Sequence, residues 1–428
     1  MSGPGVNSVT ISKRKILRHL PKGGKKMLVV KKFGGTSVGT PERIMNVAKR
    51  CVEDYQRGND VVVVLSAMGK TTDELIDLAH TVNSHPPKRE LDMLMTTGEQ
   101  VSVAMMAMAM DSLGVRAVSL NAFQVTMHTT SKYGSARLKR IDTDRIMHEL
   151  EDRKIVIVTG FQGVNKYDDI TTLGRGGSDT TAVALAAALH ADACEIYTDV
   201  DGVYTADPRH VPKARKLKEI TYDEMLELAT LGAGVLHNRS VEMAKKYGVV
   251  LVGRSSLNFS EGTVVKEDAK MERMLISGVA VDKDADRISV IGLKDRPGVA
   301  FRLFDVLAKA NVNVDMILQS IGRDGTKDIS FTCSNGDMYD ALRAIEANKE
   351  RLQYKEVKSK DDVAKLSIVG AGMMTNPGVA AKMFEALYNE DINIGMISTS
   401  EIRVTVLIDE KDADRAANAV HDAFGLAE

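Results

Sequence analysis

Hydrophobic and polar positions in the first 260 residues alternate so as to predict strands and helices in turn. The predicted strands are short apolar runs, typical of strands buried inside a sheet, at 28–30, 61–65, 155–158 and 195–199. A helix is expected at 42–55, because Thr40 can cap it and Pro41 suits its first position. Since each predicted strand ends in a polar or glycine-rich loop, we expect a mostly parallel α/β sheet with ligands along its carboxyl edge.

The most informative loop is 171–179, Thr-Thr-Leu-Gly-Arg-Gly-Gly-Ser-Asp, which runs into an Ala- and Leu-rich helix. Free N–H groups at a helix N-terminus attract anions, and glycines let the backbone approach them closely. A second glycine loop, Lys-Phe-Gly-Gly-Thr-Ser at 32–37, follows the first predicted strand. Two such loops in one chain predict an anionic ligand.

Beyond about residue 260 the pattern becomes an internal repeat with an offset of 80 residues. The segment 297–300, Pro-Gly-Val-Ala, recurs at 377–380. Six more residues recur at the same offset: Phe304, Leu307, Asn313, Met316, Ile317 and Ser320 match Phe384, Leu387, Asn393, Met396, Ile397 and Ser400. Each copy reads as strand, Pro-Gly turn, amphipathic helix, turn and strand, which predicts two small α+β modules.

We therefore divide the chain into five segments. They are a basic extension at 1–26, predicted to be disordered; an α/β domain at 27–262; a charged linker at 263–285; a first module at 286–365; and a second module at 366–428.

Composition narrows the class of protein further. The 428 residues carry a net charge of −1, which offers no electrostatic footprint for nucleic acid or for a membrane surface. No apolar run approaches the roughly 18 residues of a membrane span. Cys51, Cys194 and Cys333 are widely spaced, so neither a metal site nor a disulfide framework is indicated. We expect a cytoplasmic protein.

The extension at 1–26 contains seven Lys or Arg residues and no acid. A nucleic-acid-binding arm and a transit peptide are two interpretations of such a segment. We favour a third, because Lys22-Gly23-Gly24 can be encoded by a ribosome-binding sequence shortly before Met27. Met27 would then be the native start, and the extension a solvated tail.

Several motifs in a fixed order resemble those of aspartate kinase, which phosphorylates the side-chain carboxylate of aspartate with ATP. They are the loop at 32–37, Thr-Gly-Glu at 97–99, the loop at 174–179, Thr-Asp-Val-Asp-Gly-Val-Tyr at 198–204, and the repeat, which resembles the family's paired ACT modules. The resemblance implies a three-layer αβα amino-acid-kinase fold with a mostly parallel sheet, followed by two α+β, ferredoxin-like ACT modules. It also implies the first step of lysine, threonine and methionine biosynthesis, with feedback inhibition by lysine, threonine or both.

The resemblance also assigns roles to residues of the kinase domain. Catalytic roles fall to Lys32 and Asp179, and aspartate binding to Thr72, Glu99, Arg175 and Ser178. ATP binding falls to Lys32, Gly34, Gly35, Ser37, Ser66, Thr198, Asp199, Tyr204 and Arg209. The acceptor carboxylate, with an ordinary pKa of about 3.9, is ionised at neutral pH, so no general base is required. Mg²⁺ is expected to arrive with ATP, without a dedicated protein site.

Two departures from the family pattern lie close together. Gly234 stands where some relatives have a lysine near the nucleotide, and Asn238 stands where many have a proline. The histidine before Asn238, His237, is expected to be a packing residue.

In the repeat, the helix that opens at 297–300 offers free N–H groups to an amino-acid carboxylate. We expect Asp315 to pair with the effector's ammonium group, and the second copy lacks this carboxylate because it has Gly395 there. The full set of expected effector residues is Asp295, Pro297, Gly298, Val299, Ala300, Asn313, Asp315, Gln319, Val379, Ala380, Asn393, Ile394, Ser400 and Glu401. These sites are expected between modules of two chains.

Other functions remain open at this point. A kinase of the same fold acting on glutamate, acetylglutamate or a nucleotide is one alternative, and a catalytically inactive amino-acid sensor is another. The expected assembly is a homo-oligomer or an α₂β₂ complex with a fragment translated from Met271, because Lys266-Glu267-Asp268 can encode a ribosome-binding sequence before it.

Overall fold

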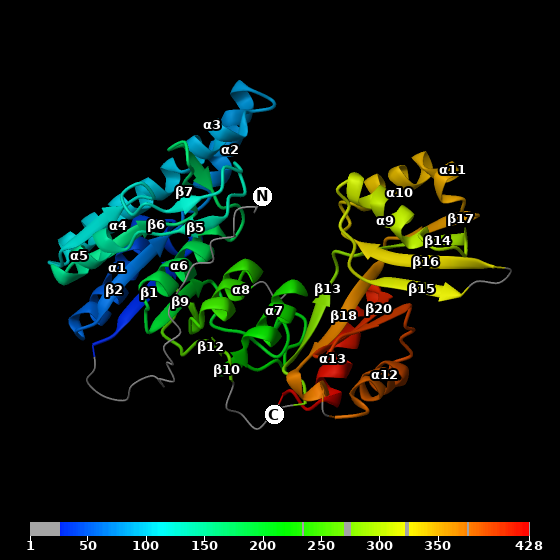
Figure 1. Ribbon diagram of the computed structural model, residues 1–428. Coiled ribbons are helices and arrows are strands. Elements are labelled where there is room, and N and C mark those ends of the chain that lie inside the picture. The colour runs from blue at the N-terminus through cyan, green and yellow to red at the C-terminus, as the bar shows by residue number, and fades with distance from the viewer. Residues whose placement is uncertain (1–25, 233–234, 269–274, 322–324, 375, 428) are drawn as a thin grey trace, which may run out of the picture.

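The computed structural model describes residues 26–232, 235–268, 275–321, 325–374 and 376–427. An N-terminal α/β domain is followed by two smaller modules, which are coloured yellow and orange to red in Figure 1. The predicted extension at 1–26 lies almost wholly outside the described residues. The predicted fold class is confirmed: a mostly parallel sheet between helices is followed by two modules with antiparallel sheets.

The main sheet has eight strands among the described residues. Their order is β10 (Glu219–Thr221), β12 (Thr263–Lys266), β11 (Leu251–Ser255), β9 (Ala193–Thr198), β1 (Leu28–Phe33), β2 (Asp60–Leu65), β6 (Ile155–Thr159) and β3 (Ala117–Leu120). All neighbours are parallel except β11 and β12. The central strands β9, β1, β2 and β6 therefore end at one shared carboxyl edge.

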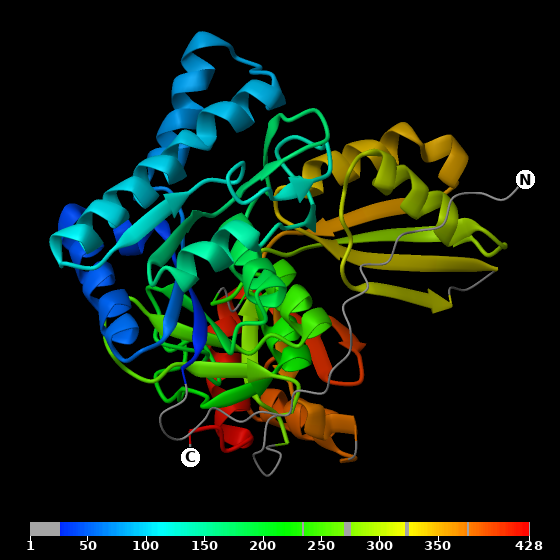
Figure 2. The same cartoon turned by 60° about the vertical axis from the view of Figure 1, so that its left-hand side comes forward.

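Helices cover both faces of this sheet (Figures 1 and 2). Those of the N-terminal domain are α1 (Pro41–Gln56), α2 (Thr71–Val82), α3 (Lys88–Met95), α4 (Thr97–Ser112), α5 (Asp144–Glu151), α6 (Gly177–Ala188), α7 (Tyr222–Thr230) and α8 (Asn238–Tyr247). Side chains of β2 alternate between the faces: Val61 and Val63 pack toward α1 and α4, and Val62 and Val64 toward α6 and α8. Thr40 caps α1 as expected, since its side chain accepts a hydrogen bond from Arg43 N.

A smaller sheet lies beside the carboxyl edge. Its strands run in the order β5 (Leu138–Arg140), β4 (His128–Thr129), β7 (Gln162–Val164) and β8 (Ile170–Thr172). Helices α2 and α3 project next to it at the top of Figure 2. No helix in the described residues is long and apolar enough to cross a membrane.

The first module combines one antiparallel sheet with helices on one side. Its elements are β14 (Asp286–Lys294), α9 (Val299–Lys309), β15 (Ile317–Ile321), β16 (Thr326–Cys333), α10 (Met338–Ala347), α11 (Lys349–Leu352) and β17 (Glu356–Lys360). The second module has β18 (Val363–Val369), α12 (Val379–Asn389), β19 (Met396–Thr399), β20 (Arg403–Asp409) and α13 (Ala413–Ala423). The repeat thus forms two similar units, as predicted.

The segment expected to be a linker, 263–285, contains strands instead. Residues 263–266 are β12 of the main sheet, and β13 (Gly278–Asp282) is an edge strand of the second module, paired antiparallel with β18. The chain therefore enters the second module, leaves it to build the first, and returns. Strand β18 also begins at Val363, before the expected boundary at 366.

The loop that follows β9 packs into the second module. Ala206 and Val211 belong to that module's hydrophobic core. Thr205 accepts a hydrogen bond from Val279 N of β13 at 2.7 Å, and its hydroxyl lies 2.9 Å from His421 Nε2 of α13. This loop of the N-terminal domain and the second module consequently form one packed unit.

Candidate active site

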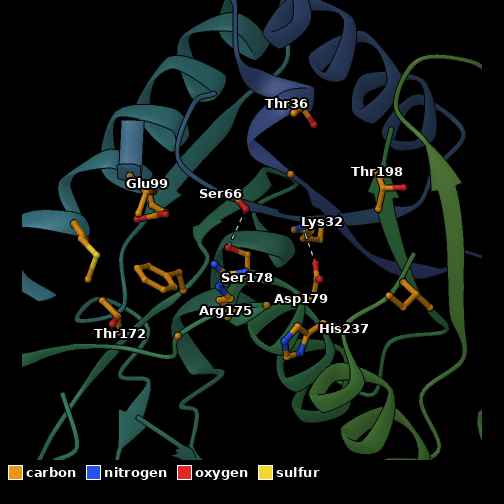
Figure 3. Close-up of a pocket in the computed structure, with 18 of the residues that line it drawn as sticks. Lys32, Thr36, Ser66, Glu99, Thr172, Arg175, Ser178, Asp179, Thr198 and His237 are labelled. Carbon is orange, nitrogen blue, oxygen red and sulfur yellow. Dashed lines mark hydrogen bonds and ion pairs between the residues drawn. The ribbon is translucent and has the colours of Figure 1, made fainter. Parts of the chain in front are cut away.

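A cavity of 940 Å³ opens at the carboxyl edge of the main sheet (Figure 3). Ten residues predicted for the site line it: Lys32, Gly34, Ser66, Thr72, Glu99, Arg175, Ser178, Asp179, Thr198 and Asp199. They come from the ends of β1, β2 and β9 and from the first turns of α2, α4 and α6. The parallel strands bring these distant segments together, because all of them end at the same edge.

Two adjacent lysines of β1 have opposite environments because successive strand residues point to opposite faces. Lys32 faces the cavity, and its Nζ lies 2.7 Å from Asp179 Oδ1 at the start of α6. Lys31 is only 1% exposed and faces the other way, with Nζ 2.5 Å from Asp54 and 2.6 Å from Glu195. Burial disfavours its charge, but the Glu195 and Asp54 carboxylates outweigh burial and raise the pKa of Lys31. Lys32 is therefore the lysine available to a ligand.

The glycine loop before α6 has a backbone that favours glycine. Gly174 has φ 77° and Gly176, the N-cap of α6, has φ 66°. Between them, Arg175 is exposed and makes no hydrogen bond or ion pair with any residue that the structure describes. Its guanidinium group is thus free for a ligand.

Two sets of hydrogen bonds hold this loop from either side. Asp92 of α3 is fully buried, and its carboxylate accepts hydrogen bonds from Thr172 N, Thr172 Oγ1 and Gly134 N at 2.8–3.1 Å. Burial raises the pKa of Asp92. Arg239 of α8 donates to Leu173 O at 2.8 Å and to Ala136 O at 3.0 Å. The position of the Arg175 loop is therefore set by α3 and α8.

Glu99, in the first turn of α4, is 2% exposed. Its Oε1 accepts a hydrogen bond from Ala67 N at 3.1 Å, whereas Oε2 is buried and has no partner in the described residues. Burial raises the pKa of Glu99 to about 7. A cationic ligand beside Oε2 would satisfy that atom and restore the ionised form. Nearby, Ser66 and Ser178 share a hydrogen bond of 2.9 Å (Figure 3).

Four residues predicted to bind ATP do not line the cavity. Tyr204 donates its hydroxyl to Asp201, and Arg209 makes a forked contact with Asp207. Ser37 is buried and bonds Ser256. A Cβ at Gly35 would lie 2.7 Å from Ala67 O in the loop after β2, so packing requires a glycine at this position. All four residues therefore have contacts within the chain that do not involve a ligand.

The cavity has further lining residues to which the sequence analysis assigned no role in the site, although Thr36, Thr172 and Gly177 lie within the two glycine loops. They are mainly Thr36, Phe161, Thr172, Gly177, His237 and Asn238. Phe161 has an unusual backbone angle, φ 69°, which is visible only in the structure, and nothing in the sequence around it indicated a site residue. His237 was expected to be a packing residue, yet it also faces the cavity (Figure 3). Gly234 lies outside the described residues.

No cluster of three or more His, Cys, Asp or Glu side chains within the described ranges is arranged to hold a metal ion.

The expected effector residues are divided between the ends of each module. Asp295 donates its N–H to Gly325 O at the β15–β16 turn, whereas Asp315 donates its N–H to Thr332 O at the other end of β16. The first turn of α9, which follows Asp295, is therefore not brought together with Asn313 or Asp315 inside one module. A site that combines the first turn of α9 with Asn313 or Asp315 therefore needs a second module, in agreement with the expected location between modules of two chains.

Asp315 already has a cationic partner within the chain. Lys365 Nζ of β18 lies 2.8 Å from Asp315 and 2.8 Å from Asp282 of β13. Burial disfavours the charge on Lys365, but its hydrogen bonds to the two carboxylates outweigh burial and raise its pKa. Asp315 therefore has an internal cationic partner, and its contact with an effector's ammonium group stays a prediction.

The remaining effector residues lie in equivalent places of the two modules. Gly298 and Gly378 are the N-caps of α9 and α12, with Val299, Ala300, Val379 and Ala380 in the first turns. Gln319 lies on the edge strand β15, and Ser400, which donates its N–H to Arg403 O, follows the edge strand β19. Pro297, Asn313, Asn393 and Glu401 are exposed, and Ile394 is half-buried.

Comparison with known proteins gives consistent results. The amino acid kinase family matches residues 27–252, and the ACT domain matches residues 288–348 and 366–424. The aspartokinase of Bacillus sp. strain MGA3 is 52% identical over 401 residues, covering 94% of this chain and 98% of that protein. Escherichia coli aspartokinase III, solved with aspartate and ADP, is 26% identical with a TM-score of 0.76, covering 92% of this chain and 99% of that one. The same enzyme solved with lysine and aspartate also has a TM-score of 0.76 and 26% identity, covering 93% and 99%.

Proposed function

The chain belongs to the aspartokinases of the amino acid kinase family, and we propose that it transfers the γ-phosphoryl group of ATP to the side-chain carboxylate of L-aspartate. The observation that carries this proposal is the pair formed by Glu99 and Arg175. A buried carboxylate with an unpaired oxygen and a free guanidinium group line one cavity, and they complement the ammonium and α-carboxylate groups of an amino acid. Aspartate bound in this way directs its side chain toward Ser66, Ser178 and Lys32.

Charge neutralisation is the main chemical task, because the acceptor carboxylate and the phosphates are all anionic. Lys32 provides a compact positive charge at the transferring phosphoryl group. Asp179, 2.7 Å from Lys32 Nζ, holds that ammonium in position. A general base is not needed, since the aspartate side chain ionises near pH 4.

The nucleotide is proposed to lie against Gly34, Thr198 and Asp199, with the phosphates toward Lys32. Tyr204 and Arg209 could reach it only if their contacts with Asp201 and Asp207 open. Mg²⁺ would enter with ATP and be held by phosphate oxygens and water, neutralising phosphate charge in the transition state.

The ACT modules are proposed to bind lysine, threonine or both, and thereby to lower activity. One solved aspartokinase III holds lysine together with aspartate, which supports lysine as one effector class. The contacts of Thr205 with β13 and α13 give the second module direct access to the loop beyond Asp199. The product would enter lysine, threonine and methionine biosynthesis in the cytoplasm. The assembly is proposed to be a homo-oligomer or an α₂β₂ complex with the Met271 fragment, whose start lies outside the described residues.

Hydroxylamine trapping tests the proposal, because aspartyl phosphate forms a hydroxamate. We expect ATP-dependent hydroxamate from aspartate and none from glutamate. Lysine and threonine, added singly and together, should lower the rate. Equal turnover of glutamate, or no turnover of aspartate, would contradict the assignment.

A further inference from the structure

His237 lies at the N-cap of α8 with its imidazole ring against the backbone of Gly176. An ideal Cβ at Gly176 would fall 2.2 Å from His237 Cγ, 2.4 Å from Cδ2 and 2.6 Å from Nδ1. These are the three nearest atoms, so the Nε2 edge of the ring points away from Gly176. The ring therefore covers Gly176, the N-cap of α6, and its Nε2 edge faces away from that glycine.

The two ring nitrogens have different surroundings. Nδ1 is buried and has no hydrogen-bond partner in the described part of the chain. Nε2 is not among the buried unpaired atoms, and the residue lines the cavity. Since a neutral imidazole carries one proton, and a buried N–H without an acceptor is costly, the favoured tautomer has a bare Nδ1 and a protonated Nε2. The ring then offers an N–H donor to the cavity.

The position of this donor selects the ligand. In the view of Figure 3, His237 lies next to Asp179, below the Lys32–Asp179 pair, whereas Arg175 and Ser178 lie between Glu99 and that pair. The proposed function places the nucleotide phosphates toward Lys32, whose Nζ lies 2.7 Å from Asp179, so the ring is close to the expected position of the phosphates. The N-termini of α6 and α8 converge here, and their dipoles favour negative charge.

We propose that His237 donates a hydrogen bond from Nε2 to a phosphate oxygen of the bound nucleotide. This inference rests on the proposed function, in which ATP is the phosphoryl donor. It adds a phosphate contact from α8, on the side of the cavity opposite β1. A purely packing residue over Gly176 would need no nitrogen, and the unpaired Nδ1 is a cost that an apolar side chain would avoid.

Three substitutions at this position separate donation from packing. His237→Leu keeps bulk over Gly176 but removes the donor, so ATP and ADP should bind about 10–100-fold more weakly, the usual effect of losing a hydrogen bond to a charged group. Adenosine binding should be unchanged. His237→Gln can place an amide N–H near the Nε2 position and should restore binding to within about 3-fold. His237→Asn is shorter, reaches only the Nδ1 position, and should not restore it.

Dissociation constants are measured by isothermal titration calorimetry with ATP, ADP and adenosine on the full-length chain. His148→Leu, at an exposed site on α5, is the matched control and should bind all three like the parent. Circular dichroism checks folding, and if His237→Leu does not fold, the comparison of His237→Gln with His237→Asn decides.

Unchanged ATP binding by His237→Leu would overturn the proposal, as would an equal loss of ATP and adenosine binding. A rise in the KM for aspartate without a change in nucleotide binding would place the contact on the acceptor instead, and would also overturn it. Hydroxamate formation by the parent protein is measured in parallel. Its absence would refute the proposed acceptor alone, whereas its presence with unaffected His237 variants would refute only this inference.

Discussion

Replacing Glu99 by glutamine should stabilise the ligand-free protein at alkaline pH and abolish the binding of aspartate through this side chain. Burial raises the pKa of this carboxyl from its ordinary 4.5 to about 7, and Oε2 has no partner in the described residues. The folded protein therefore favours the protonated form. The stabilising contribution of protonated Glu99 is complete below pH 4.5 and is lost as the pH rises through 7.

The magnitude follows from the two pKa values. The difference of about 2.5 pKa units between 4.5 and 7 corresponds to about 3 kcal/mol in the free energy of unfolding. The parent protein loses this stabilisation at pH 8, where Glu99 is ionised. Glutamine has no charge to bury, but its unpaired amide N–H costs about 1 kcal/mol or more. We expect Glu99→Gln to be more stable than the parent by about 1–2 kcal/mol at pH 8, and this advantage to disappear at pH 5.

The assay is urea unfolding followed by circular dichroism at pH 5 and pH 8, together with aspartate kinetics. Because the substrate ammonium needs ionised Glu99, the parent's KM for aspartate should rise about tenfold per pH unit below 7. The variant should have a high KM without this pH dependence. Glu385→Gln, on an exposed position of α12, should match the parent in both assays. A variant that is no more stable at pH 8 and keeps the parent's KM would refute the reasoning.

Four further predictions use the same hydroxamate assay or simple purification. Lys32→Ala should lower kcat by ~10²–10³, the scale of one preorganised electrostatic donor, with little change in aspartate KM; near-normal kcat would contradict its role. Arg175→Lys should raise the KM for aspartate by at least ~10-fold, because an ammonium cannot make the forked carboxylate contact, and an unchanged KM would remove Arg175 from the substrate site. Asp315→Ala should raise the effector concentration needed for feedback inhibition by ~5–150-fold without changing the uninhibited activity. Equal inhibition of the variant and the parent would exclude that site. The unmodified gene should yield a second, C-terminal chain of about 17 kDa that starts at Met271, given 46.5 kDa for 428 residues. Changing the Met271 codon to a non-start codon should remove that chain. If the chain never co-purifies from the unmodified gene, the second start does not exist.

Local sequence was sufficient for the elements and for most of the cavity. The strands at β1, β2 and β6 follow from β-branched runs, and the start of α1 follows from Thr40 and Pro41. The parallel arrangement then implied a shared carboxyl edge, where Lys32 and Asp179 do meet. These inferences succeed because hydrophobic period, caps and glycine turns act over a few neighbouring residues.

Contacts between segments that are far apart in the sequence could not be predicted in this way. Strand β13 was assigned to a linker because nothing in its own residues shows that it pairs with β18, about 90 positions later. Tyr204 and Arg209 were expected to contact the nucleotide, and the sequence did not show that they also bond carboxylates nearby in the loop, Asp201 and Asp207. Motif matching names residue types, but it does not tell which partner satisfies each of them.

The sequence by itself determined the order of strands and helices, the two glycine loops and the paired modules. Only the tertiary structure decided which polar atoms were left without partners. Glu99 Oε2 and His237 Nδ1 are unpaired because of what surrounds them after folding, whereas Asp315 is paired with Lys365, 50 residues away. Burial and pairing depend on side chains that arrive from distant segments, so the availability of a charged group for a ligand is a property of the packed molecule.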